Sequence, residues 1–265
     1  MNPSDGVIVL MYHRVGSARN AWEARYAIDP ERFAAHMFAL ARRGMRPVSL
    51  EALIDWMENG TPLSAGAFAL TFDDGFRSVR EHALPVLERL HWPFTVFLVS
   101  ELLGKEDVWT RASNPDGATY PLLSAEEILD MQRRGVAFHS HTCSHASLPG
   151  LDDDRLSREL VESRAVLQGL LGRPVDYLAY PFGHLDDRVV AAARHAGYRS
   201  GFSTQPGFNR RDVDRFRIRR IDVYGTDTAT MLVRKVRLGT NDGRLSNLAR
   251  YYLTRARARL PFRTR

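Results

Sequence analysis

Short apolar runs alternate with amphipathic stretches along most of the chain. Seven runs have the length and the β-branched or aromatic content of strands. They are residues 6–13, 67–74, 93–100, 135–141, 176–182, 200–204 and 215–223. Six stretches between them have a helical pattern, and several begin at Asp or Ser and end at Gly, as helix caps require. They are residues 29–44, 49–60, 77–91, 124–135, 152–173 and 186–197.

The order of these elements predicts the fold class. Strands that read as nearly continuous apolar runs and alternate with helices indicate parallel strands covered by helices. We therefore expect an α/β fold, with one strand fewer than a closed eightfold barrel. Residues 103–121 are expected to form a long loop of the kind that often lines a site. No strand is followed by a glycine-rich phosphate loop, which argues against a nucleotide-binding protein.

The composition is that of a globular protein, with 44% hydrophobic and 26% charged residues in 265. The single cysteine, Cys143, excludes an internal disulfide framework. The first apolar run is too short for a signal peptide or a membrane span, and no basic segment precedes it. These features lead us to expect a cytoplasmic protein.

The positive charge is concentrated at the C-terminal end. The chain has a net charge of +6, but residues 243–265 contain seven arginines and no acidic residue, which leaves 30 basic and 31 acidic residues elsewhere. This near-neutral body argues against nucleic-acid binding. From Leu245 onward, apolar residues at 245, 248, 249, 252 and 256 share one helix face. We expect a helical basic tail over residues 226–265, either docked on the main domain or resting on an anionic membrane surface.

Ionisable residues gather where the predicted strands end. His13 ends the first strand, Asp73 and Asp74 end the second, and "HSHTCSH" and "YPFGH" follow the fourth and fifth. Arginines lie along the last predicted strand, in "RFRIRRIDV". Because active groups in such folds lie at the carboxyl ends of strands, we expect these side chains to meet at one rim.

His141 and His145 are four residues apart, a spacing that lets two imidazoles share one face of a helical turn. Two histidines and one carboxylate form a three-ligand set with open positions, which is typical of catalytic metal sites. One aspartate of the Asp73–Asp74 pair can bind the metal, while its neighbour removes a proton from water. Each motif alone has a structural explanation, a surface histidine pair or a turn, so the prediction depends on their joint placement.

The motifs "TFDDG", "HTCSH" and "YPFG", in this order, resemble those of the polysaccharide deacetylases of the NodB-homology type, carbohydrate esterase family 4. "MYHRV" and "RIRRI" are similar to segments of the branch of that family that acts in polysaccharide biosynthesis. The resemblance covers about residues 6–225. We therefore expect residues 1–225 to form the deacetylase barrel domain. It implies a distorted (β/α)7 barrel and metal-dependent removal of an N-acetyl group from an amino sugar.

The resemblance also implies roles for individual residues. Asp73 resembles the general base, and Asp74 resembles the metal-binding carboxylate. His141 and His145 resemble the two histidine ligands. The backbone N–H of Phe182 matches the group that stabilises the oxyanion. Tyr180, Pro181 and His184, in and just after "YPFG", are expected to contact substrate.

The chain departs from the family pattern in two places. The third motif commonly begins with Arg, and Ala179 is found there instead, so Arg220 is our candidate for orienting Asp73. No histidine follows His195 to act as the general acid. His13 is the substitute that the biosynthetic branch suggests, and His184 is a second candidate.

We therefore expect one divalent metal ion, with zinc favoured over cobalt, manganese or iron. The expected partner is an N-acetylated glycan or a lipid-linked saccharide, and not a nucleic acid. Two alternatives stay open: a metal-dependent amidase for a small amide, and a carbohydrate-binding protein without catalysis.

Overall fold

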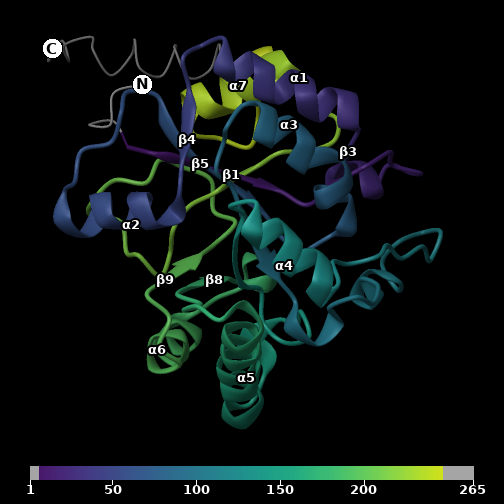
Figure 1. Cartoon of the computed structure of the whole chain (residues 1–265), viewed down its shortest axis with the longest axis vertical. Coiled ribbons are helices and arrows are strands. Elements are labelled where there is room, and N and C mark those ends of the chain that lie inside the picture. Colours follow the sequence, from purple (N-terminus) through teal and green to yellow (C-terminus); the bar gives the residue numbers. More distant parts are fainter. Residues whose placement is uncertain (1–5, 247–265) are drawn as a thin grey trace, which may run out of the picture.

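The computed structural model describes residues 6–246, in which a curled parallel sheet is surrounded by helices (Figure 1). The strand order is β10-β1-β5-β6-β7-β8-β9, and β4 also pairs with β5. The strands of this sheet are β1 (Ile8–Tyr12), β4 (Arg46–Val48), β5 (Ala67–Phe72), β6 (Thr95–Leu98), β7 (Ala137–Ser140), β8 (Tyr177–Ala179), β9 (Ser200–Phe202) and β10 (Ile221–Asp222). A separate short pair, β2 (Arg14–Val15) and β3 (Ala27–Ile28), lies beside the end of β1.

Helices follow most of the strands, and side-chain caps start many of them. They are α1 (Pro30–Ala41), α2 (Leu50–Asn59), α3 (Leu84–Arg89), α4 (Ala125–Arg133), α5 (Asp153–Leu171), α6 (Asp187–His195) and α7 (Ala229–Leu238). Asp29 caps α1 ahead of Pro30, and Ser124 forms a reciprocal capping box with Glu127 at α4. These caps satisfy backbone N–H groups that the first helical turn leaves without partners.

The two edges of the sheet meet through the segment around residues 218–222. Ile218 forms a parallel bridge with Phe202 at the end of β9. Three residues later, Ile221 pairs with Leu10 of β1. This segment therefore closes the curled sheet, and it brings residues from the two ends of the described chain together.

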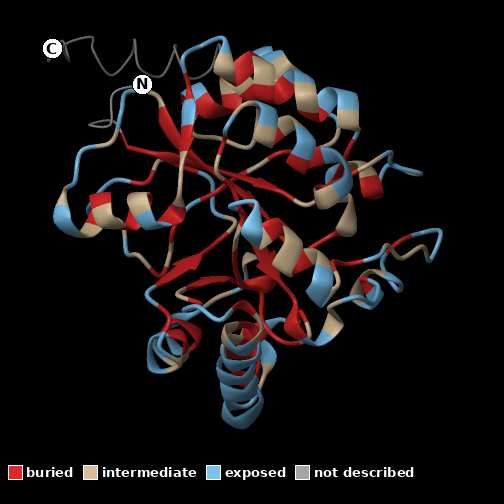
Figure 2. Ribbon diagram, in the orientation of Figure 1, coloured by how far each residue is buried: buried red, intermediate tan, exposed pale blue. Residues whose placement is uncertain are grey.

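Alternating strand residues supply two hydrophobic cores. Ile8, Leu10 and Tyr12 of β1 belong to the larger core, which also includes residues of α1, α3, α4, α5, α6 and α7. Val9 belongs to the smaller core with Phe97 and Phe202, and the apolar face of α2 completes it. Figure 2 shows buried residues along the strands and exposed residues on the outer sides of the helices. This period-2 alternation is what a sheet packed on both faces requires.

All seven predicted strands and all six predicted helices are present, although most of them are shorter than predicted. The structure adds the short strands β2, β3 and β4. Helix α7 lies within the segment predicted as a tail, and it packs against α1. Its Lys235 donates to the Asp222 carbonyl at 2.9 Å and pairs with Asp227. The remaining tail prediction, at residues 248, 249, 252 and 256, lies outside the described residues. Over residues 6–246, no helix is both long and apolar enough to cross a membrane.

Candidate active site

The carboxyl ends of the strands surround a pocket of about 400 Å³. His13 follows β1, Asp73 and Asp74 follow β5, and His141 follows β7. These residues line the pocket together with His145, Phe182 and His184. The predicted meeting of distant polar residues at one rim therefore occurs, because all of these strands are parallel and end on the same side.

Asp74, His141 and His145 converge on one point. The Nε2 atoms of His141 and His145 lie 3.4 Å and 3.2 Å from Oδ1 of Asp74, and all three side chains are buried. Their potential ligand atoms lie within 4.8 Å of one another. Two imidazole nitrogens and one carboxylate oxygen form a donor set that suits a divalent transition metal.

The surroundings of this triad fit a bound cation. Oδ1 of Asp74 is buried and has no hydrogen-bond partner among the described residues. Nδ1 of His141 lies 2.8 Å from the carbonyl oxygen of Ala179, so it donates its proton there and leaves the Nε2 lone pair facing the triad. Burial alone would raise the pKa of Asp74, but the neighbouring imidazoles of His141 and His145 lower it, so the carboxylate is charged. Burial lowers the pKa of His145, which favours the neutral imidazole that can act as a ligand.

Unusual backbone conformations are concentrated around the triad. Asp74, Thr142, His145 and Phe182 all have positive φ, at 73°, 70°, 65° and 58°. Only one other non-glycine residue of the described chain, His91, shares this property. A non-glycine residue in this region costs of order 1–3 kcal/mol, and such residues are typical of functional sites. The backbone here is therefore held in a conformation that aims the side chains at one point.

Asp73 is held by a bidentate ion pair with Arg220. Nη1 and Nη2 of Arg220 donate to Oδ1 and Oδ2 of Asp73 at 2.6 Å and 2.7 Å, and Arg220 is fully buried. Burial alone would raise the pKa of Asp73, but the guanidinium charge outweighs it and lowers that pKa. Arg220, our candidate because Ala179 is found where the family commonly has Arg, is thus paired with Asp73. It orients Asp73 and keeps it ionised.

The two candidate acids differ in their surroundings. The ring of His13 lies 5.5 Å from that of Tyr26, at the wall formed by residues 14–28. The ring of His184 lies 5.5 Å from that of Phe182, and its Nδ1 lies 2.9 Å from the Ser147 hydroxyl oxygen at the surface. The ring of Phe182 is half exposed and makes an edge contact with His145 at 4.6 Å. Their predicted roles, including that of the Phe182 N–H, stay predictions.

The expectation that Tyr180 and Pro181 contact substrate is wrong for their side chains. Tyr180 is fully buried, and its hydroxyl donates to the carbonyl of Phe216 at 3.0 Å. Neither residue lines the pocket. Their place is below the rim, where they support the turn that presents Phe182. Gly183 follows with a φ of 70°, and a Cβ at this position would lie 2.1 Å from Oγ1 of Thr204. This turn therefore requires glycine.

Sequence reasoning missed much of the pocket wall. Trp109 stacks on His145 with ring centroids 4.3 Å apart and planes at 19°. Trp109 lies in the loop 103–121, and the expectation that this loop lines a site could have identified it. Burial raises the pKa of the nearby Asp107 to about 6. Asp222 also lines the pocket, and its spacing of two from Arg220 on a strand could have identified it.

Three comparisons place this geometry among known proteins. A family model described as polysaccharide deacetylase matches residues 61–201. A poly-beta-1,6-N-acetyl-D-glucosamine N-deacetylase of Staphylococcus epidermidis is 27% identical over 216 residues, which is 78% of this chain and 71% of that protein. The solved structure of IcaB from Ammonifex degensii has a TM-score of 0.69 and 28% identity, covering 82% of this chain and 91% of that one.

A deacetylase of Streptococcus pyogenes, PplD, shares the fold, with a TM-score of 0.74 over 87% of this chain and 98% of that one, at 20% identity. The expected distorted (β/α)7 barrel is thereby confirmed, and so is the expected enzyme class, a hydrolase of carbon–nitrogen bonds other than peptide bonds. The chain belongs to the polysaccharide deacetylase family.

Proposed function

We propose that this protein is a metal-dependent deacetylase that removes the N-acetyl group from an amino sugar of a polysaccharide. One observation carries the proposal: a buried Asp74–His141–His145 triad lies beside a second carboxylate, Asp73, which an arginine keeps charged. Amide hydrolysis needs an activated water, a base and a proton donor for the amine, and this pocket has a residue for each.

Asp74, His141 and His145 would hold the metal ion. A divalent metal bound there would act as a Lewis acid and would lower the pKa of a bound water. The identity of the metal is proposed from the donor set alone, which suits zinc.

The remaining steps use side chains and backbone of the chain. Asp73 accepts the proton of the attacking water, since each oxygen of an ionised carboxylate keeps a second lone pair when it is bonded to Arg220. The Phe182 N–H donates to the carbonyl oxygen as negative charge develops on it. His13 then gives a proton to the departing amine, which leaves the sugar with a free amino group and releases acetate.

A glycan of N-acetylglucosamine is the proposed substrate. The support comes from the Staphylococcus epidermidis relative, whose name gives it a polymer of this sugar. The pocket volume of about 400 Å³ lies within the range of small-molecule sites.

The test combines metal analysis with acetate release from β-1,6-linked N-acetylglucosamine oligomers. We expect close to one equivalent of metal, lost in His141→Ala and kept in Asp73→Asn, with no acetate released by either variant. His13→Ala should slow release roughly 10²–10⁴-fold. His195→Ala is the matched control, because His195 is exposed on α6 and outside the pocket.

Two results would contradict the assignment. Stoichiometric metal in His141→Ala would place the ion elsewhere, and metal loss in Asp73→Asn would reverse the roles of the two aspartates. Release of ammonia from a small amide, without acetate release from any glycan, would favour the amidase alternative.

A further inference from the structure

The loop that carries the two histidines of the triad is held from outside by helix α5. We propose that Glu159 of α5 is a positioning residue, which fixes the backbone of residues 141–145 so that both imidazoles face Asp74 before a metal ion binds. The inference rests on the proposed function, because it concerns the metal site of that function. None of the proposed chemical steps uses Glu159.

The carboxylate of Glu159 points at the middle of this loop. The residue is 9% exposed. Its Oε2 accepts from the backbone N–H groups of Cys143 and Ser144, at 2.9 Å and 3.0 Å. Its Oε1 accepts from the Ser144 hydroxyl. Hydrogen bonds to a charged acceptor are about twice as strong as those between neutral groups, so Glu159 is a strong anchor for two successive peptide groups.

The neighbouring backbone groups of the loop are also paired. The Thr142 N–H donates to the Ser140 hydroxyl oxygen at 3.1 Å, and that oxygen lies 2.7 Å from the Ser163 hydroxyl oxygen, one turn beyond Glu159 on α5. The carbonyl oxygens of Thr142 and Cys143 accept, both at 3.0 Å, from the first two N–H groups of the 3₁₀ helix Ser100–Leu102. The loop is therefore held between α5 and this short helix.

The loop needs such support, because its own residues disfavour its shape. Thr142 and His145 have φ of 70° and 65°, a region that L residues avoid and that is worst for a β-branched residue. Distances from a metal ion to its ligands vary by only about 0.2 Å. A loop that relaxed would carry His145 away from Asp74, and the cost of reordering the loop would be subtracted from the affinity for the metal.

The experiment measures zinc affinity by chelator competition, starting from metal-free protein. We expect Glu159→Gln to weaken zinc binding roughly 10-fold and Glu159→Ala roughly 100-fold, the range found for residues that orient metal ligands. Glutamine keeps the shape and one acceptor oxygen, whereas alanine leaves both backbone N–H groups without this partner. Glu162→Gln is the matched control, because Glu162 is an exposed glutamate on the same helix and its carboxylate pairs with Arg158 at 3.1 Å.

Two further measurements separate positioning from stability. The visible spectrum of the cobalt-loaded protein reports the ligand geometry, so it should change in Glu159→Gln and stay the same in Glu162→Gln. Urea unfolding of the metal-free proteins gives the stability of each variant. Ser144→Ala removes one of the three donors to Glu159 and keeps both N–H groups, so its zinc affinity should fall less than that of Glu159→Gln. This variant keeps the inference testable if Glu159→Ala does not fold.

The outcomes distinguish this inference from the proposed function. Unchanged zinc affinity and cobalt spectrum in Glu159→Gln, or an equal loss in Glu162→Gln, would show that Glu159 contributes only to the stability of the fold. Weaker zinc binding in Glu159→Gln, together with no acetate release by the wild type, would support the positioning role and contradict the proposed function. A wild type that binds no metal would overturn both.

Discussion

Asp73 and Arg220 illustrate how strongly a buried charge depends on its partner. Arg220 is fully buried, and its ion pair with Asp73 has side-chain exposures of 0% and 3%. Removing one member of such a pair leaves the other charge uncompensated in a low-dielectric interior, which costs about 3–5 kcal/mol.

We therefore expect Arg220→Met to lower the free energy of unfolding by about 3–5 kcal/mol, measured by urea titration. The double variant Asp73→Asn/Arg220→Met should recover part of this loss, because no unpaired charge is left. Additive losses in the double variant would show that the pair contributes through packing alone.

His36 predicts a pH dependence of stability. It is fully buried on α1, with Nδ1 3.1 Å from the Tyr12 hydroxyl and Nε2 2.8 Å from the Asp227 carbonyl. Burial lowers its pKa to about 4 from 6.5. Between these two pH values the unfolded chain binds a proton at His36 and the folded chain does not. The stability that the neutral, buried His36 contributes is therefore fully present above pH 6.5 and is lost as the pH falls to 4. The loss is about 3 kcal/mol.

The measurement is the free energy of unfolding from pH 7.5 to 4, for the wild type and for His36→Gln. The difference between the two curves should change by about 3 kcal/mol across this window. Asp107, whose pKa is raised to about 6, titrates in the same window with the opposite sign, but it is common to both proteins and cancels. A constant difference would show that His36 is not responsible.

At the scale of elements, hydrophobic patterning located the strands and helices because most of them bury one face or both. It missed β4, which has three residues and contains Pro47. It predicted a helical tail over residues 226–265 but gave no bounds for α7, where Lys235 occupies a buried position that a pattern of apolar residues cannot reveal. Lys235 is tolerated there because it pairs with Asp227, and such a pair is visible only in the folded chain.

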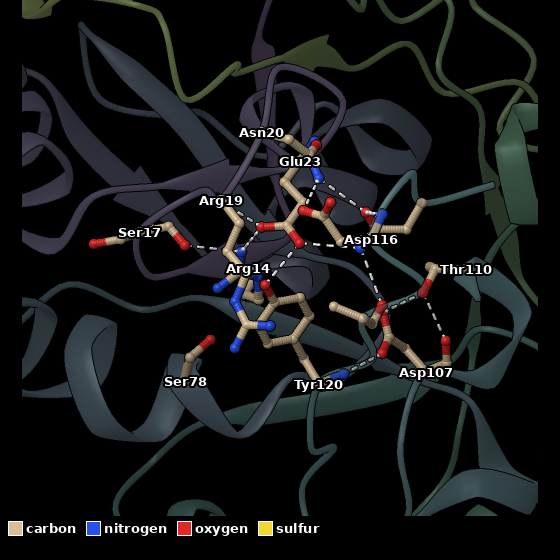
Figure 3. Close-up of polar contacts among 12 residues, drawn as sticks. Arg14, Ser17, Arg19, Asn20, Glu23, Ser78, Asp107, Thr110, Asp116 and Tyr120 are labelled. Carbon is tan, nitrogen blue, oxygen red and sulfur yellow. Dashed lines mark hydrogen bonds and ion pairs between the residues drawn. The ribbon is translucent and has the colours of Figure 1, made fainter. Parts of the chain in front are cut away.

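The candidate site could also be predicted only in part, because contacts between distant residues are visible only in the folded chain. The motifs identified Asp73 and the triad of Asp74, His141 and His145, because these residues follow strands whose order along the chain is visible in the sequence. The contacts of the buried Glu23 carboxylate (Figure 3) could not be predicted, because two of its donors, Asn114 and Tyr120, lie 91 and 97 residues away. Tyr180 was misassigned because a motif does not say which of its side chains point into the pocket and which into the core.

One prediction concerns the loop 103–121 as an element. Glu23 accepts from Arg14 and the Arg19 N–H at 3.1 Å and 2.8 Å, and from Asn114 and the Tyr120 hydroxyl of this loop at 3.0 Å and 2.7 Å. Glu23→Gln keeps the shape of the side chain but removes its charge, so two of the four donors lose a strong acceptor. We expect faster hydrogen exchange of the backbone amides of residues 107–120 and a loss of roughly 1–3 kcal/mol in unfolding free energy.

Glu81→Gln is the control, because Glu81 is an exposed glutamate in the turn of helix before α3. Exchange rates that rise equally in both variants, or in neither, would show that the loop is held by other contacts.

At the scale of the whole molecule, the basic C-terminal segment still gives a prediction from sequence alone. Residues 247–265 lie outside the described residues, and six of the chain's arginines are found there. If this segment rests on an anionic membrane, each arginine near the surface adds about 1 kcal/mol. Co-sedimentation with phosphatidylserine vesicles should then occur at low salt and disappear at high salt.

Truncation after Ser246 is the matched variant, since it keeps the Asn241 side chain that accepts from the Asp222 N–H at 2.9 Å. Unchanged vesicle binding of the truncated chain, or no binding of the full chain at low salt, would contradict the prediction.

The closure of the sheet by residues 218–222 has a consequence for the order in which a growing chain acquires its site. Asp73 and Arg220 are 147 residues apart. During synthesis from the N-terminus, Asp73, Asp74 and both histidines have all emerged while Arg220 is still to be added. A nascent chain can therefore assemble the proposed metal ligands before the proposed base, Asp73, is oriented by Arg220. The segment that ends in β10, the last strand of the described residues, supplies none of the proposed metal ligands, yet it completes the candidate site.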